Sequence, residues 1–167
     1  MQNTAVYPGT FDPFTRGHLH IVKRSLKMYD RVIISVSDHE KKNTLFSADE
    51  RVKMIEDVLK ERGLDRAEVV KFSNLIADHV EEMGARILIR GLRVTSDFEY
   101  EYKMAQFISE LNPSVEVIYL MATAKTLHIS SSGVKEIAAL GGNVSGYLPR
   151  SSNEAIMKRF GKKEESN

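Results

Sequence analysis

Five short apolar segments, rich in β-branched residues, alternate with helical patterns along the 167-residue chain. The segments are residues 5–7, 31–37, 68–72, 86–89 and 115–120. Short apolar runs separated by helices are typical of strands that are buried on both faces of a parallel sheet. Because crossovers between parallel strands are right-handed, this order predicts an α/β fold. We expect a Rossmann-like, doubly wound, five-stranded parallel sheet with helices on both faces.

The helices are expected at residues 17–29, from Ser47 onward, and at 76–83, 97–111, 131–140 and 152–160. Ser47 can cap the second helix, because Glu50 three residues later completes a capping box. With 42% hydrophobic residues the chain can bury one full core. We therefore expect a single domain over residues 1–160, followed by a flexible tail at 161–167.

The charged residues are nearly balanced, with 24 basic and 23 acidic side chains. This balance argues against the broad basic surface of a general nucleic-acid binder, although local phosphate sites stay open. The absence of cysteine excludes disulfides, a thiolate nucleophile and Cys-ligated zinc. The sequence shows no secretory signal and no apolar segment of membrane length, so we expect a cytoplasmic protein without membrane or nucleic-acid partners.

The junction after the first strand is the strongest functional signal. Prolines and a glycine within residues 8–13 break the strand, and the helix that follows carries His18 in its first turn. Unpaired backbone N–H groups and the helix dipole attract anions there, and an imidazole adds a directed donor. Thr10 and Thr15 supply hydroxyl groups nearby. An isolated histidine at a helix start is more often structural, and this alternative stays open for His18 on position alone.

Further polar residues follow the other predicted strands, namely residues 38–42, 90–93 and 122–132. Because the carboxyl ends of parallel strands meet at one edge of the sheet, we expect these segments to converge on a ligand site. Each segment also has a structural explanation. The lysines could be solvated, the arginines could pair with nearby acidic residues, and the serines could simply cap a helix.

The segment Thr15-Arg16-Gly17-His18 is similar to the T/H-x-G-H signature of nucleotidylyltransferases. Beyond this signature, the chain resembles the phosphopantetheine adenylyltransferases over nearly its whole length. The matching blocks, in order, are Gly9-Thr10-Phe11-Asp12-Pro13, Lys41-Lys42, Ile89-Arg90-Gly91-Leu92-Arg93, Asp97-Phe98-Glu99-Tyr100-Glu101 and Ile129-Ser130-Ser131-Ser132. The signature alone would be weak, but several blocks in the same order make chance agreement implausible.

The resemblance implies reversible transfer of the adenylyl group of ATP to 4′-phosphopantetheine, giving dephospho-coenzyme A and pyrophosphate. It implies direct in-line attack without a covalent intermediate, Mg²⁺ carried with ATP, coenzyme A as a further ligand, and a homohexamer. The resemblance assigns catalysis to His18, Lys42 and Thr10, and the acceptor substrate to Thr10, Lys42, Ile76 and Arg90. It assigns ATP binding to Thr10, Phe11, His18, Gly91, Leu92, Arg93, Glu101, Thr126, Leu127, His128, Ile129, Ser130, Ser131 and Ser132. No protein metal ligand is expected.

One segment departs from the family pattern. Lys125, Thr126, Leu127 and His128 stand where relatives carry an acidic residue, an aromatic, a serine and another aromatic. At this segment the packing against adenine or the affinity for the nucleotide can differ from that of relatives, while contacts from the backbone to the nucleotide can persist. For Ile76, a role in the core is an equal alternative.

Two other functions compete with this one. Adenylylation of nicotinate mononucleotide and cytidylyl transfer to a small phosphate share the T-x-G-H signature, but the blocks within residues 90–101 and 129–132 argue against both. A nucleotide sensor that has lost turnover is the alternative from another class. The retention of His18 and Lys42 argues against the sensor.

Overall fold

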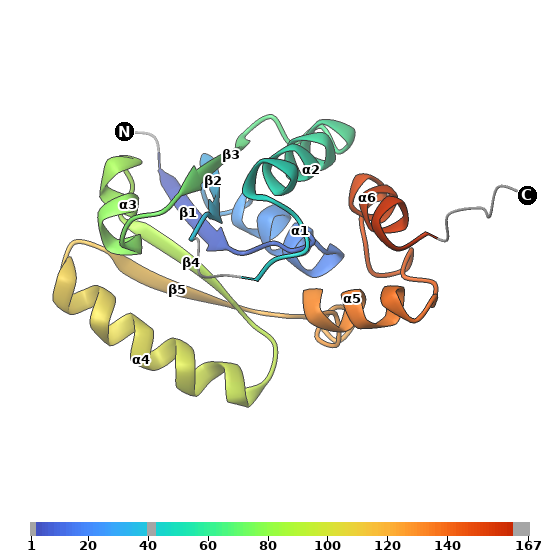
Figure 1. Cartoon of the computed structure of the whole chain (residues 1–167). Coiled ribbons are helices and arrows are strands. Elements are labelled where there is room, and N and C mark those ends of the chain that lie inside the picture. Colours follow the sequence, from blue (N-terminus) through green and yellow to red (C-terminus); the bar gives the residue numbers. More distant parts are fainter. Residues whose placement is uncertain (1–2, 40–42, 162–167) are drawn as a thin grey trace, which may run out of the picture.

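The computed structural model describes residues 3–39 and 43–161. The strands are β1 (Thr4–Gly9), β2 (Arg31–Ser37), β3 (Ala67–Phe72), β4 (Ile87–Leu92) and β5 (Glu116–Met121). The helices are α1 (Arg16–Ser25), α2 (Ala48–Glu61), α3 (Ile76–Glu82), α4 (Thr95–Leu111), α5 (Ser131–Ala139) and α6 (Arg150–Phe160). Within the described residues the strands form one parallel sheet in the order β3-β2-β1-β4-β5 (Figure 1). The predicted Rossmann-like α/β fold is confirmed.

Helices cover both faces of the sheet because neighbouring strand residues point in opposite directions. Tyr7 and Ile34 contribute to a core with α1, α2, α5 and α6. Val6 and Ile33 contribute to a second core with α3 and α4. Figure 1 shows α4 along one side of the sheet and α2 and α6 on the other. Nearly all positions of β1 and β2 are thereby buried, which explains why the sequences of these two central strands are mostly apolar.

Two strands run further than their sequences indicate. β1 was expected to end at Tyr7, but Pro8 and Gly9 continue its pairing with β2. The ladder from β1 to β4 stops after Val6, so Pro8 interrupts no pairing on that side. β4 continues to Leu92 beside β5, which places Arg90 inside a strand and not after it. The divergence of β1 from β4 opens a crevice at the carboxyl edge, where the strand order reverses.

The helix signals behave as their chemistry predicts. The Ser47 hydroxyl accepts the N–H of Glu50 at 3.2 Å, and the Glu50 carboxylate accepts the N–H of Ser47 at 2.8 Å, which is the expected capping box. After α5, Gly141 adopts a φ of +81°, a left-handed conformation that favours glycine. Across residues 3–39 and 43–161, every helix is too short or too polar to cross a bilayer. Of the tail expected to be flexible, residues 162–167 lie outside the described part of the chain.

Candidate active site at the carboxyl edge of the sheet

A cavity of about 870 Å³ opens where β1 and β4 diverge. Its wall combines the loop after β1, the first turn of α1, the end of β4, part of α4 and the start of α5. It includes the predicted residues Thr10, Phe11, His18, Ile76, Arg90, Gly91, Leu92, Arg93, Glu101, Thr126, Ile129, Ser130, Ser131 and Ser132. Segments that are distant in sequence therefore converge here, as the strand-end rule predicts.

His18 is the third residue of α1 and forms a reciprocal cap with Thr15. The backbone N–H of Thr15 donates to Nδ1 of His18 at 3.0 Å, and the backbone N–H of His18 donates to Oγ1 of Thr15 at 3.3 Å. Because a backbone N–H can only donate, Nδ1 must carry a lone pair. The proton of the neutral imidazole is then on Nε2, which makes Nε2 a hydrogen-bond donor.

Aromatic neighbours keep the His18 ring in place. The ring of Phe11 lies edge-on to it with centroids 5.0 Å apart, and the ring of Phe14 lies 5.5 Å away. Phe11 has a φ of 52°, an uncommon left-handed conformation for a bulky residue. A Cβ atom on Gly9 would lie only 2.7 Å from the Phe11 ring, so the glycine makes room for this arrangement.

Burial lowers the pKa of His18 from 6.5 to about 4, and the positive charge of Arg93 acts in the same direction. The imidazole is therefore neutral at physiological pH. This agrees with the hydrogen bond from Thr15, because a protonated Nδ1 could not accept it. His18 thus enters the site as an uncharged donor that is suited to a phosphate oxygen.

Both arginines of β4 and its following loop are paired with carboxylates of α4. Arg90 donates from Nε and Nη2 to the two oxygens of Glu101 at 2.7 and 2.5 Å. Arg93 lies 3.3 Å from Asp97. Although burial opposes the charged form, the hydrogen bonds and charge of Glu101 raise the pKa of Arg90. The ion-pair alternative therefore describes these arginines in this structure, and Glu101 fixes the orientation of Arg90 within the cavity wall.

The serine segment caps α5 and faces the same cavity. The hydroxyl of Ser130 accepts the N–H of Gly133 at 3.1 Å, and the hydroxyl of Ser131 donates to the carbonyl of Pro13 at 2.8 Å. The first turns of α1 and α5 therefore both open into the cavity. The N–H groups of Arg16 and His18 already donate to Tyr147 and Thr15, but each helix still directs the positive end of its dipole at the cavity, so the cavity has two places suited to anions.

Two of the residues predicted to contact the nucleotide lie outside the cavity wall. Within the described part of the chain, the cavity wall includes neither Leu127 nor His128. Hydrogen bonds from Thr126 and Leu127 to the carbonyl of Thr123 make a tight turn, and the ring of His128 packs edge-on against Tyr147. The predicted catalytic residue Lys42, like Lys41, lies outside the described residues.

Sequence reasoning missed several residues of the cavity wall. Tyr7 lies within β1, and burial raises the pKa of its phenol, so it stays protonated. Tyr100 and Tyr119 add further aromatic surface. Lys135 also lines the cavity and lies one turn after Ser131. The helical period from the serine segment could have identified Lys135, whereas the tyrosines resembled ordinary core or surface residues.

Comparisons with known proteins agree with this geometry. A family model described as Cytidylyltransferase-like matches residues 6–137. Two structures share the fold at 18% identity and a TM-score of 0.72. One is a bifunctional NMN adenylyltransferase/ADP ribose pyrophosphatase from Francisella tularensis, solved with AMP and a manganese ion, for which the match covers 98% of this chain and 50% of that one. The other is a protein from Vibrio parahaemolyticus assigned as a nicotinate-nucleotide adenylyltransferase, for which it covers 94% and 99%.

Curated relatives are closer in sequence. A phosphopantetheine adenylyltransferase from Geotalea daltonii is 42% identical over 156 residues, which cover 93% of this chain and 96% of that protein. One from Clostridium botulinum is 44% identical over 162 residues, which cover 97% and 98%. Agreement at this level over almost the full length of both sequences means that the chain belongs to the phosphopantetheine adenylyltransferase family.

Proposed function

We propose that the protein transfers the adenylyl group of ATP to 4′-phosphopantetheine, reversibly, giving dephospho-coenzyme A and pyrophosphate. This reaction is the penultimate step of coenzyme A biosynthesis. Among the structural features, the neutral imidazole of His18, in a cavity that the start of α5 also lines, carries the proposal. The cavity of about 870 Å³ falls in the range of small-molecule sites, and it combines apolar wall with a few directed polar groups.

The acceptor needs no strong protein base. The second pKa of a phosphate monoester is about 6, so the phosphate of phosphopantetheine is largely ionised at neutral pH. One of its oxygens attacks the α-phosphorus of ATP in line with the departing pyrophosphate. The new P–O bond forms as the bond to the β-phosphate oxygen breaks, and no covalent enzyme intermediate is needed. Catalysis then depends on positioning and on stabilising the negative charge.

The residues divide this work between the two substrates. Nε2 of His18 donates to an oxygen of the α-phosphate in the transferred adenylyl group, where charge develops. The N-terminus of α5, with Ser130 and Ser131, holds the phosphates of the nucleotide. Arg90 binds the acceptor phosphate, and Lys42 orients the same group. Thr10 lies between the two substrates.

Mg²⁺ is expected to arrive with the nucleotide. Among the residues that the structure describes, no three His, Asp or Glu side chains come together as a metal-binding cluster. Triphosphate oxygens are the hard ligands that Mg²⁺ prefers, and the ion would neutralise part of their charge. The protein residues would then bind the complex of ATP and Mg²⁺.

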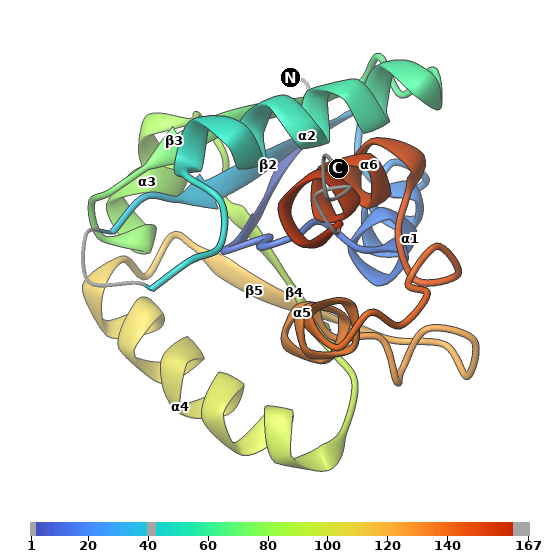
Figure 2. The ribbon, with the colours of Figure 1, turned by 45° about the vertical axis from the view of Figure 1, so that its right-hand side comes forward.

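We also propose that the protein is a homohexamer that works in the cytoplasm. The family resemblance supports the assembly, and the apolar side chains that α4 exposes are suited to contacts between copies. Phe98, Tyr102, Phe107 and Leu111 are exposed on this helix, which lies at the edge of the molecule (Figure 2). Exposed apolar surface of this kind marks an interaction site. The mass in solution, measured by native mass spectrometry, tests the hexamer.

Product analysis by mass spectrometry tests the reaction. The protein is incubated with Mg²⁺, with ATP or CTP, and with 4′-phosphopantetheine, nicotinate mononucleotide or glycerol 3-phosphate. Dephospho-coenzyme A formed from ATP and phosphopantetheine alone is the expected result. Turnover of another acceptor would move the protein to another branch of the same chemistry. ATP binding without product from any acceptor would favour a nucleotide sensor.

A further inference from the structure

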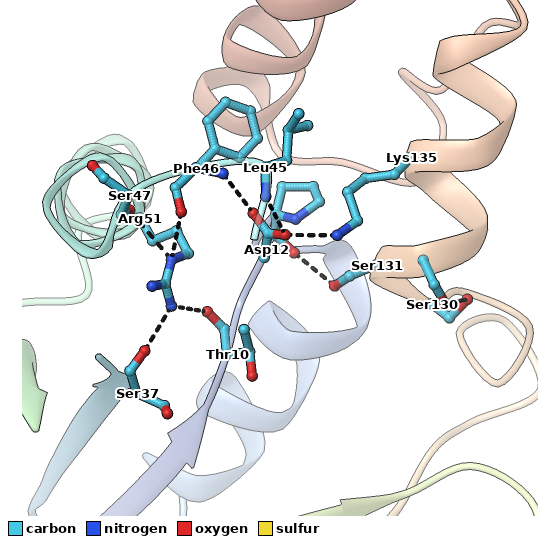
Figure 3. A network of polar contacts seen from close by, with 12 residues as sticks. Thr10, Asp12, Ser37, Leu45, Phe46, Ser47, Arg51, Ser130, Ser131 and Lys135 are labelled. Carbon is cyan, nitrogen blue, oxygen red and sulfur yellow. Dashed lines mark hydrogen bonds and ion pairs between the residues drawn. The ribbon is translucent and has the colours of Figure 1, made fainter. Parts of the chain in front are cut away.

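Asp12 is a buried carboxylate that connects three segments distant in sequence (Figure 3). Its Oδ1 accepts the N–H of Phe46 at 3.0 Å, and its Oδ2 accepts the N–H of Leu45 at 2.9 Å. Oδ2 also accepts a hydrogen bond from Nζ of Lys135 at 2.6 Å. The side chain of Asp12 is only 4% exposed, whereas that of Lys135 is 28% exposed. Asp12 thus joins the loop after β1 to the segment before α2 and to α5.

The loop after β1 is attached to α5 at a second point. The hydroxyl of Ser131 donates to the carbonyl of Pro13, the residue after Asp12. Two adjacent loop residues therefore hold two residues that are one turn apart on α5. A single contact would let the helix pivot, but two contacts fix both its distance and its rotation relative to the loop.

Arg51 fixes the other side of this loop. Its Nη1 donates to the carbonyls of Thr10 and Ser37 at 2.7 and 2.9 Å, and its Nε donates to the carbonyl of Phe46 at 3.1 Å (Figure 3). Burial lowers the pKa of Arg51, and the charges of Asp12 and of a second acid act in the opposite direction. The loop after β1 is therefore held by a buried anion on one side and a buried cation on the other.

Stability alone is a weak reason for such an arrangement. Burying a charge costs several kcal/mol, and a buried ion pair often gives no net gain over apolar residues of the same volume. What the network fixes is the relation between two helix N-termini. α1 carries His18 and α5 carries the serine cap, and both face the cavity. Reacting groups must be held within about 0.5 Å of the productive geometry.

Resting on the adenylyl transfer proposed above, we propose that Asp12 is a positioning residue for this reaction. Together with Lys135, it holds the N-terminus of α5 at a fixed place relative to His18. Phosphates bound at α5 then present the α-phosphorus to the imidazole and to the incoming acceptor. Asp12 lines the cavity beside Lys135, but its side chain is only 4% exposed, and in this proposal it acts through the backbone and through Lys135.

Breaking this attachment affects turnover more than binding. The N–H groups of α5 still bind phosphates, but the nucleotide is displaced from His18. A displacement of about 1 Å can lower the rate of a positioned reaction by about 10²-fold. A residue needed only for stability would lower the midpoint of thermal unfolding and leave the turnover of the folded protein unchanged.

The main test variant is Lys135→Met, which keeps most of the length of this partly exposed side chain and removes its charge. We expect kcat to fall about tenfold or more, while KM and the directly measured Kd for ATP change less than about threefold. Lys135→Arg keeps the ion pair and should keep most of the activity. Asp12→Asn should lower kcat as well. The double variant Asp12→Asn/Lys135→Met should be no slower than Asp12→Asn, because both changes remove the same contact.

Lys53 and Asp57 provide a matched control. They form an ion pair at 2.5 Å on the exposed face of α2, with side chains 69% and 40% exposed. Lys53→Met should leave kcat unchanged. Dephospho-coenzyme A is first measured with the wild-type protein, because its absence would refute the proposed function itself.

With an active wild type, a Lys135→Met variant that keeps its kcat would overturn the inference about Asp12. Loss of ATP affinity in Lys135→Met with unchanged kcat in Asp12→Asn would also overturn it, since Lys135 would then bind phosphate directly. If Asp12→Asn does not fold, the kcat values of Lys135→Met and Lys135→Arg test the inference on their own.

Discussion

His18 should stay uncharged at every pH at which the protein works, and acidification tests this expectation. Its Nδ1 accepts the backbone N–H of Thr15 at 3.0 Å, so protonation would bring two N–H groups face to face. Burial, with a smaller effect of Arg93, lowers the pKa from 6.5 to about 4. At pH 7 only about one folded molecule in a thousand then carries a charged imidazole at this position.

The same shift predicts how stability depends on pH. Between about pH 4 and pH 6.5 the unfolded chain binds a proton at His18 that the folded chain excludes. The free energy of unfolding therefore rises with pH through this window, and the contribution of His18 is complete above pH 6.5. Because one pKa unit corresponds to about 1.4 kcal/mol, the protein should lose about 3 kcal/mol at His18 when the pH falls from 7 to 4.

His18→Gln isolates this effect, because glutamine at the third helical position can still complete the capping box but does not titrate. Urea unfolding of the wild type and of His18→Gln is measured from pH 4 to pH 8. Burial also lowers the pKa values of His20 and His79. Both proteins contain these residues, so their contributions cancel when one curve of stability against pH is subtracted from the other. NMR titration of the imidazole C–H signals gives the pKa directly. A midpoint near 6 or above for His18 would refute the argument that burial lowers its pKa.

Three further substitutions test other parts of the site and fold. Arg90→Lys cannot keep the bidentate pair with Glu101, so KM for phosphopantetheine should rise about tenfold or more, and an equal rise in KM for ATP would contradict this role. Gly9→Ala places a Cβ 2.7 Å from the ring of Phe11 and should lower kcat while circular dichroism keeps its helical signal; unchanged kinetics would count against the packing described. Ser47→Ala removes the cap of α2 and should lower the free energy of unfolding in urea by about 1 kcal/mol, with normal activity as the check on specificity.

The sequence predicts the sheet well because the strand signal is strong and local. Apolar, β-branched runs separated by helices identify each strand, and Ser47 with Glu50 marks a helix start. The predicted ends of β1 and β4 were wrong because Pro8 and Gly91 are residue types that often end strands. Whether such residues end a strand depends on the neighbouring strand, and β2 and β5 keep the pairing going.

The candidate site was predicted in position but not in detail. Strand ends bring Thr10, His18 and Arg90 to one edge, and this follows from topology alone. The partner of Arg90 could not be predicted, because both a phosphate and several carboxylates lie within reach of a long side chain. The sequence does not predict that Arg51 holds the loop after β1, since there it is one polar residue among others on a helix. Its burial arises only when the strand-end carbonyls of distant segments surround it.

The sheet is least connected at the position where the cavity opens. β1 is in register with β2 over six residues, and β4 is in register with β5 over six, but β1 and β4 pair at only two. The molecule therefore resembles two halves, β3-β2-β1 and β4-β5, joined along a short seam. Substrates that contact His18 on one half and Arg90 on the other would link the two halves and stabilise the short contact between them. Amide hydrogens of β4 should then exchange more slowly in the presence of both substrates than in their absence.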